Sequence, residues 1–218
     1  MKPSKASVLY VPIIGGLCSG KSTAVGYVKN TFRGITVLEE AAARVLKVNR
    51  LENGWSGARS EDIVRKIGSY THTRLAEIVE GAWGKRVVEE SGLLAFLGHL
   101  RADGYVSLAQ EYEPKLPELL AKVDPFVVFI DVPPDIAWER RKERYRAQTK
   151  RFVEKEGGNE EEIMRQLKTR MEGVYANVKA LYTGLASDKV TIPNVDDEPK
   201  FLERLASTLP DILGRGAA

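Results

Sequence analysis

Nine consecutive residues near the amino end carry the chemical groups needed to bind a triphosphate. They are Gly15, Gly16, Leu17, Cys18, Ser19, Gly20, Lys21, Ser22 and Thr23. Together they match the pattern G-x-x-x-x-G-K-[ST] in full. Glycines let backbone N–H groups surround phosphate oxygens, where a Cβ atom would obstruct the approach. The lysine ammonium can then reach the β and γ phosphates, and the serine hydroxyl can bind Mg²⁺. The segment therefore predicts a nucleoside triphosphate site.

The residues on either side of this loop predict the elements that must position it. The apolar run 8–14 precedes the loop and is typical of a strand, while Val25, Val28 and Phe32 follow at helical spacing. A helix that begins at the loop directs the partial positive charge of its amino end at the phosphates. A glycine-rich turn without function is the alternative, and the order strand, loop, helix disfavours it.

A first pair of acids, Glu39 and Glu40, follows the short β-branched strand predicted over 35–38. Ligands of open α/β sheets bind at the carboxyl ends of the strands, so these acids are candidates for contact with a substrate. We expect Glu39 to act as the general base toward an acceptor hydroxyl or to hold a sugar, with Arg44 near the substrate. The alternative is a pair of solvated acids at the start of a helix.

A second pair of acids, Glu89 and Glu90, ends the strand predicted over 85–90. A carboxylate at this point can hold Mg²⁺ together with Ser22, directly or through water. The residues alone do not decide which of the two acids would do so. Glu89 is also a candidate substrate-binding residue.

A strongly basic stretch follows the apolar strand predicted over 126–130. Residues 139–151 include seven basic and two acidic side chains, a surplus larger than the net charge of +3 for the whole chain. Arg140 and Arg144 lie one helical turn apart, and guanidinium groups match the charge distribution of a phosphoryl group in transfer. We therefore expect both arginines to be catalytic, in a helical lid of about 138–160. A solvated basic face or a nucleic-acid patch is the alternative.

The composition indicates one globular domain, 1–218, with 43% hydrophobic and 29% charged residues. The small net charge of mixed sign disfavours nucleic acid as a partner. Cys18 is the only cysteine, which excludes an internal disulfide and fits a reducing compartment. No apolar run reaches the about 20 residues of a membrane span, so we expect a cytoplasmic protein without a membrane partner.

The motifs together resemble those of the phosphate-loop (P-loop) kinases of small metabolites, in the thymidylate kinase and deoxynucleoside kinase branch. The similarity rests on "GGLCSGKST", on the acidic turns "VLEEAAARVL" and "VVEESGLLAFL", and on "FVVFIDVPPDIAWERRKERYR". It implies a three-layer α/β sandwich whose parallel five-stranded sheet has the order 2-3-1-4-5. The family usually carries an acid–arginine pair at the third-strand turn, where this chain has Glu89, Glu90 and Ser91. The arginine that grips a substrate phosphate is therefore missing from its expected place.

The resemblance implies an ATP- and Mg²⁺-dependent phosphotransferase that acts on a small nucleoside- or nucleotide-type acceptor. A kinase of another small polar metabolite is one alternative, and "EEAAARVL" is similar to nicotinamide riboside kinase-like enzymes. A regulatory P-loop ATPase or GTPase switch without an acceptor is another. The acceptor pocket depends on Trp55, Tyr70, Trp83 and Phe96, which the sequence does not place in space. It also leaves open whether the protein is a homodimer.

Overall fold

The strands of the computed structural model, which describes residues 7–48 and 60–215, form one parallel sheet. The order along this five-stranded sheet is β2-β3-β1-β4-β5. This confirms the predicted fold class and strand order. The strands are β1 (Leu9–Gly15), β2 (Thr36–Leu38), β3 (Arg86–Glu90), β4 (Asp124–Asp131) and β5 (Asp188–Pro193).

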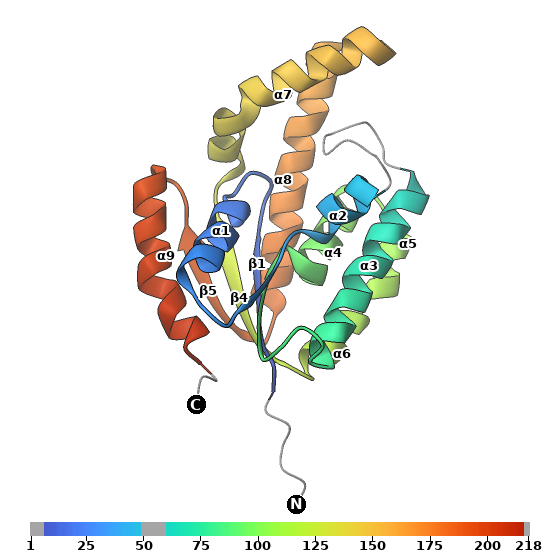
Figure 1. Ribbon diagram of the computed structural model, residues 1–218. Coiled ribbons are helices and arrows are strands. Elements are labelled where there is room, and N and C mark those ends of the chain that lie inside the picture. Colours follow the sequence, from blue (N-terminus) through green and yellow to red (C-terminus); the bar gives the residue numbers. More distant parts are fainter. Residues whose placement is uncertain (1–6, 49–59, 216–218) are drawn as a thin grey trace, which may run out of the picture.

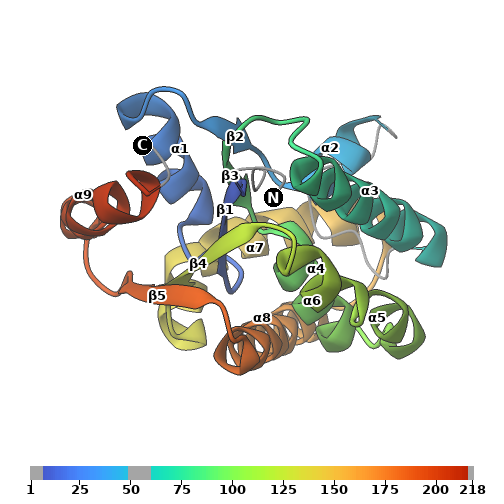
Figure 2. The same cartoon turned by 90° about the horizontal axis from the view of Figure 1, so that it is seen from below.

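Helices cover both faces of the sheet (Figures 1 and 2). On one face lie α1 and α9, and on the other lie α3, α4 and α8 (Figure 2). The helices are α1 (Lys21–Thr31), α2 (Ala41–Val48), α3 (Glu61–Val79), α4 (Gly92–Ala102), α5 (Val106–Tyr112), α6 (Lys115–Leu120), α7 (Pro134–Glu156), α8 (Glu160–Gly184) and α9 (Glu198–Leu213).

Alternation along β1 explains why its sequence is apolar throughout. Tyr10 and Ile14 belong to the apolar cluster shared with α4 and α8, whereas Val11 and Ile13 belong to the cluster shared with α1 and α9. Successive side chains of a strand point to opposite faces, and here both faces are covered. A parallel strand buried on both sides therefore requires the continuous apolar run seen in the sequence.

The parallel register brings the candidate site residues to one edge of the sheet. Ile13 of β1 pairs with Glu90 of β3, and Leu38 of β2 pairs with Glu89. All strands run in the same direction, so the phosphate loop after β1 and both acidic turns emerge at the carboxyl ends of neighbouring strands. This is the edge at which open α/β sheets bind ligands.

The basic stretch lies on α7, which extends above this edge in Figure 1 and packs against α8. Between the two helices the chain turns at Gly157 and Gly158, which have φ angles of +80° and +116°. Asn159 then caps α8 by accepting a hydrogen bond from the backbone N–H of Glu162 at 3.0 Å. Trp55, a predicted pocket residue, lies outside the described residues. Within the described ranges, no helix has the length and apolar character needed to cross a membrane.

Helices α4 and α8 approach each other closely at Gly98. A Cβ atom on Gly98 would lie 2.4 Å from a methyl carbon of Val178 and 3.1 Å from its backbone nitrogen. Gly98→Ala should therefore push the helices apart and cost about 1–3 kcal/mol of unfolding free energy. Urea unfolding followed by circular dichroism measures the change.

Gly173→Ala on α8 is the matched control, because its Cβ atom would make an ordinary 3.5 Å contact with Ala102. The higher helix propensity of alanine should make this variant neutral or more stable by up to about 1 kcal/mol. Equal losses in both variants would contradict the packing argument.

Candidate active site

The phosphate loop has a backbone shape that depends on its glycines. Gly20 has a φ angle of +94°, and a Cβ atom there would lie 2.5 Å from Nδ2 of Asn194. A Cβ atom on Gly15 would lie 2.6 Å from the carbonyl oxygen of Ile130. The Asn194 amide in turn donates a hydrogen bond to the carbonyl of Ser19 at 2.9 Å. The loop between β1 and α1 is thus held by close contacts that a side chain would prevent.

Lys21 lies in the first turn of α1 and is only 9% exposed. Its ammonium group donates hydrogen bonds to the carbonyls of Gly16 at 2.8 Å and Gly15 at 3.4 Å. Burial lowers the pKa of Lys21, and the negative charges of Glu40 and Glu90 oppose that shift. A buried cation beside a loop of this shape is suited to binding the oxygens of a polyphosphate.

Glu90 is the acid that meets the phosphate loop. The hydroxyl of Ser22 donates a hydrogen bond to its carboxylate at 2.6 Å. Burial raises the pKa of Glu90, although the bond from Ser22 lowers it. A hydroxyl and a carboxylate oxygen side by side are the hard donors that Mg²⁺ prefers. Residues 7–48 and 60–215 contain no group of three His, Cys, Asp or Glu that could hold a metal ion. These two donors therefore fit a Mg²⁺ ion that is also bound by phosphates and water.

Glu89, a candidate for metal and substrate binding, lies in the interior. Its side chain is 0% exposed, forms an ion pair with Arg74 and accepts a hydrogen bond from the Tyr10 hydroxyl. Burial, followed by the charge of Glu89, raises the pKa of Tyr10 well above its ordinary value. Glu89 does not line the cavity. Neighbouring strand residues face opposite sides of the sheet, and Glu90 is the one that faces Ser22 of α1.

The turn after β2 also separates its two acids. Glu40 lines the cavity, whereas Glu39 is exposed, and its carbonyl accepts a hydrogen bond from Arg74 at 2.8 Å. Arg44 is exposed as well, with its guanidinium carbon 5.7 Å from the centre of the Tyr70 ring. Of the acids and bases predicted here, only Glu40 therefore faces the cavity.

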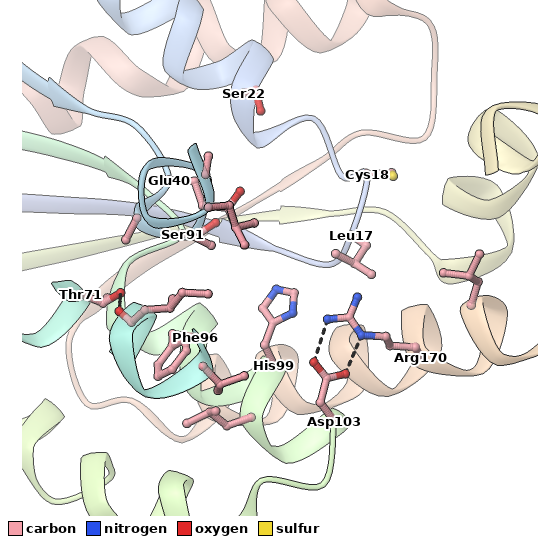
Figure 3. A pocket seen from close by; sticks show the side chains of 18 of the residues that line it. Leu17, Cys18, Ser22, Glu40, Thr71, Ser91, Phe96, His99, Asp103 and Arg170 are labelled. Carbon is pink, nitrogen blue, oxygen red and sulfur yellow. Dashed lines mark hydrogen bonds and ion pairs between the residues drawn. The ribbon is translucent and has the colours of Figure 1, made fainter. Parts of the chain in front are cut away.

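A cavity of about 660 Å³ opens beside the phosphate loop (Figure 3). Its walls come from the loop, the start of α2, the middle of α3, the inner face of α4, and the facing sides of α7 and α8. Phe96 of α4 lines this cavity. Tyr70 instead lies between Arg44 and Arg74, and Trp83 donates a hydrogen bond to Glu77 away from the cavity.

The lid helix presents a different face to the cavity than the sequence suggested. Arg141, Arg144, Tyr145 and Gln148 line it, a set with helical spacing. Arg140 points elsewhere and donates hydrogen bonds to the carbonyls of Asn194 at 2.8 Å and Asp196 at 2.7 Å. The structure therefore brings Arg144 to the site and places Arg140 against the loop between β5 and α9.

Tyr145 joins the lid to the phosphate loop, a contact that the sequence analysis missed. Its hydroxyl lies 3.1 Å from the thiol sulfur of Cys18, and its ring stacks on Trp138. Burial raises the pKa of Tyr145, and the neighbouring Cys18 adds to the shift. Cys18 itself has a φ angle of +58°, an uncommon conformation for a residue with a side chain. Nothing in the local sequence pairs these two residues.

No family model matches the chain, and no curated protein matches its sequence. Solved structures do share its fold. The structure of deoxyadenosine kinase from M. mycoides with bound dATP has a TM-score of 0.56 at 14% identity, covering 91% of this chain and 98% of that chain. The same enzyme with the products dCMP and a flexible dCDP has a TM-score of 0.58 at 14% identity, covering 93% and 99%. At this identity the similarity shows the fold alone.

Replacing Glu90 with glutamine should raise the free energy of unfolding at pH 7, because the amide keeps the hydrogen bond from Ser22 and removes a buried charge. Because the pKa of Glu90 is raised, its carboxyl group binds a proton more tightly in the folded protein than in the unfolded chain. Ionisation of Glu90 therefore lowers the free energy of unfolding. The gain in unfolding free energy of Glu90→Gln over the wild type should be complete above the raised pKa of Glu90. It should vanish below 4.5, the ordinary pKa of a glutamate, where the wild-type carboxyl group is protonated in both states. Urea unfolding across this pH range measures it.

Glu89→Gln is the matched comparison, because it leaves the Arg74 guanidinium buried without a carboxylate. It should lower the free energy of unfolding by roughly 3–5 kcal/mol. If Glu90→Gln destabilised the protein as much, the division into a structural and a site carboxylate would be wrong.

Proposed function

We propose that the protein is an ATP-dependent kinase that transfers the γ-phosphoryl group, with Mg²⁺, to a small nucleoside-type acceptor. One observation carries the proposal: Ser22 of the phosphate loop, which donates a hydrogen bond to Glu90, lines the same cavity as Glu40 and Arg144 of α7. A donor site and an acceptor-sized cavity that share one opening suit phosphoryl transfer better than a nucleotide switch. The fold shared with a nucleoside kinase supports the choice of acceptor class.

The donor phosphates would lie on the loop amides at the amino end of α1. Lys21 would exchange its bonds to the Gly15 and Gly16 carbonyls for bonds to phosphate oxygens. Ser22 and Glu90 would hold the Mg²⁺ ion, which neutralises phosphate charge and orients the γ-phosphoryl group. The remaining metal ligands would come from the phosphates and water.

The acceptor would lie in the cavity beside α3 and α4. We assign to Glu40 the role first expected of Glu39, because Glu40 is the acid that lines the cavity. Its carboxylate would accept a hydrogen bond from an acceptor hydroxyl, either the reacting one or one on the sugar. The apolar wall that includes Phe96 would contact the base.

The lid would stabilise the charge of the group in transfer. Arg141 and Arg144 line the cavity from α7, and their planar guanidinium groups suit the equatorial oxygens of the phosphoryl group. Arg140 instead donates hydrogen bonds to the carbonyls of Asn194 and Asp196. We assign it to positioning the loop between β5 and α9, whose Asn194 donates a hydrogen bond to the carbonyl of Ser19 in the phosphate loop.

An acceptor screen tests the proposal directly. Purified protein with MgATP should release ADP in the presence of nucleosides, nucleoside monophosphates or both, and Lys21→Ala should abolish this release. Mass spectrometry should show a product heavier than the acceptor by one phosphoryl group. Acceptor-independent ATP hydrolysis would instead favour the regulatory switch, and phosphorylation of a non-nucleoside would favour a kinase of another polar metabolite.

The arginine assignment makes a separate prediction. Arg144→Ala should lower kcat by roughly 10²–10³-fold, as expected for removing one group that stabilises transition-state charge. Its unfolding midpoint should stay unchanged, because Arg144 is exposed on the lid. Arg140→Ala should mainly raise the KM for ATP through the loop it holds. Steady-state kinetics decide between the two arginines, and a larger kcat loss in Arg140→Ala would reverse the assignment.

A further inference from the structure

A paired arginine and aspartate form part of the cavity wall that the proposed mechanism does not use. Arg170 of α8 donates from Nε to Oδ1 of Asp103 at 2.5 Å and from Nη2 to Oδ2 at 2.7 Å. The two side chains are 24% and 25% exposed, and both line the cavity (Figure 3). A bidentate pair of this kind fixes the plane of the guanidinium group.

The pair leaves part of the guanidinium group available. A guanidinium group has five N–H donors. Asp103 accepts hydrogen bonds from two of them, one on Nε and one on Nη2. In the described part of the chain, Nη1 of Arg170 makes no hydrogen bond. In Figure 3 the guanidinium group lies between Leu17 of the phosphate loop and His99 of α4, with its third nitrogen directed away from Asp103. Arg170 thus offers an oriented cationic donor to the cavity.

The position of Arg170 is close to the phosphate loop. Burial dominates the raised pKa of Tyr145, and the positive charge of Arg170 opposes the shift. The hydroxyl of Tyr145 is the group that contacts Cys18. The charge of Arg170 therefore acts at the point where the loop, the lid and the cavity meet.

Arg170 differs from the lid arginines in being fixed to the core. It projects from α8, whose approach to α4 is so close that Gly98 has no room for a Cβ atom beside Val178. Asp103, at the end of α4, holds it from the other side. Arg170 therefore belongs to the rigid wall of the acceptor cavity, whereas Arg141 and Arg144 belong to the helix that covers it.

We propose that Arg170, oriented by Asp103, binds an anionic group of the acceptor, and that the acceptor is a nucleoside monophosphate. The inference rests on the proposed kinase function and specifies its substrate class. The turn after β3 offers Glu90 and Ser91 but no cation, so the fixed cation of this cavity comes from α8 instead. Arginine is the side chain best matched to phosphate, and the donors that Asp103 leaves unused are directed so that they can bind one.

Transfer to a phosphate group requires no general base, because the attacking oxygen is already ionised. An oxygen of the acceptor phosphate bonds to the γ-phosphorus as the bond from that phosphorus to the bridging oxygen of ADP breaks, which yields ADP and a nucleoside diphosphate. The acceptor phosphate is largely ionised at neutral pH, because its second pKa is about 6. Glu40 then serves to hold a sugar hydroxyl.

The test compares the four deoxynucleoside 5′-monophosphates with the matching nucleosides as acceptors of the full-length protein. The monophosphates should be phosphorylated with the higher kcat/KM. Arg170→Gln should raise the KM for the monophosphate by about tenfold or more, since it removes a charged hydrogen bond to phosphate. The KM for ATP should change little. Arg170→Lys should recover part of the loss, and Asp103→Asn should show a smaller increase because it only loosens the orientation of Arg170.

Arg165→Gln is the matched control on the same helix, because Arg165 is exposed and pairs with Glu162 outside the cavity. Arg165→Gln should leave kcat, the KM for the monophosphate and the KM for ATP unchanged. A purely structural role for Arg170 would instead lower the unfolding midpoint of Arg170→Gln and leave its KM for the monophosphate intact. Phosphorylation of nucleosides alone, or a rise in the KM for ATP rather than for the acceptor, would overturn the proposal.

Calorimetry with the same monophosphates in the absence of ATP separates this inference from the proposed function. The wild-type protein should bind at least one of them, and Arg170→Gln should bind it about tenfold or more weakly. Binding without any transfer would refute the kinase and keep the anion site. Transfer to nucleosides without monophosphate binding would keep the kinase and refute the anion site.

Discussion

The buried ion pair between Arg74 and Glu89 connects the elements that surround the cavity. Arg74 comes from α3 and also donates a hydrogen bond to the Glu39 carbonyl at the end of β2. Glu89 comes from β3 and accepts a hydrogen bond from Tyr10 of β1. Removing one partner of such a pair is costly, because the other charge remains buried. The pair therefore fixes β3, and with it the next residue, Glu90, at the mouth of the phosphate loop.

Much of the fold follows from local features of the sequence. The apolar runs at 8–14 and 126–130 predicted the strands β1 and β4, and the glycine pattern placed the turn and the start of α1 correctly. The strand order came from the resemblance of the motifs to a known family, since periodicity does not encode which strands are neighbours. It also holds in the structure. The loop was predictable because backbone shape and phosphate chemistry constrain the same few residues.

The division of roles within the site could not be predicted in the same way. Glu89 and Glu90 are identical in type and both are buried. Their partners, Arg74 of α3 and Ser22 of α1, distinguish the structural acid from the one at the phosphate loop. Arg140 and Arg141 are consecutive on α7, so their side chains leave the helix in different directions. The packing of α7 on α8 decides which of them faces the cavity. Arg170 lies between core residues of α8 and gives no local signal. Each of these assignments depends on contacts between residues far apart in the sequence.

The arrangement separates fixed charges from charges carried by the lid. Lys21 is buried in the loop, where the Gly15 and Gly16 carbonyls accept hydrogen bonds from its ammonium group and burial lowers its pKa. Arg144 is exposed on α7, so its charge is hydrated in the absence of a ligand. Water between a cation and a phosphate weakens their attraction, and its removal strengthens it. Lys21 would therefore determine where the polyphosphate binds, and Arg141 and Arg144 would add most of their stabilisation once a ligand displaces water from the cavity and the phosphoryl group is in transfer.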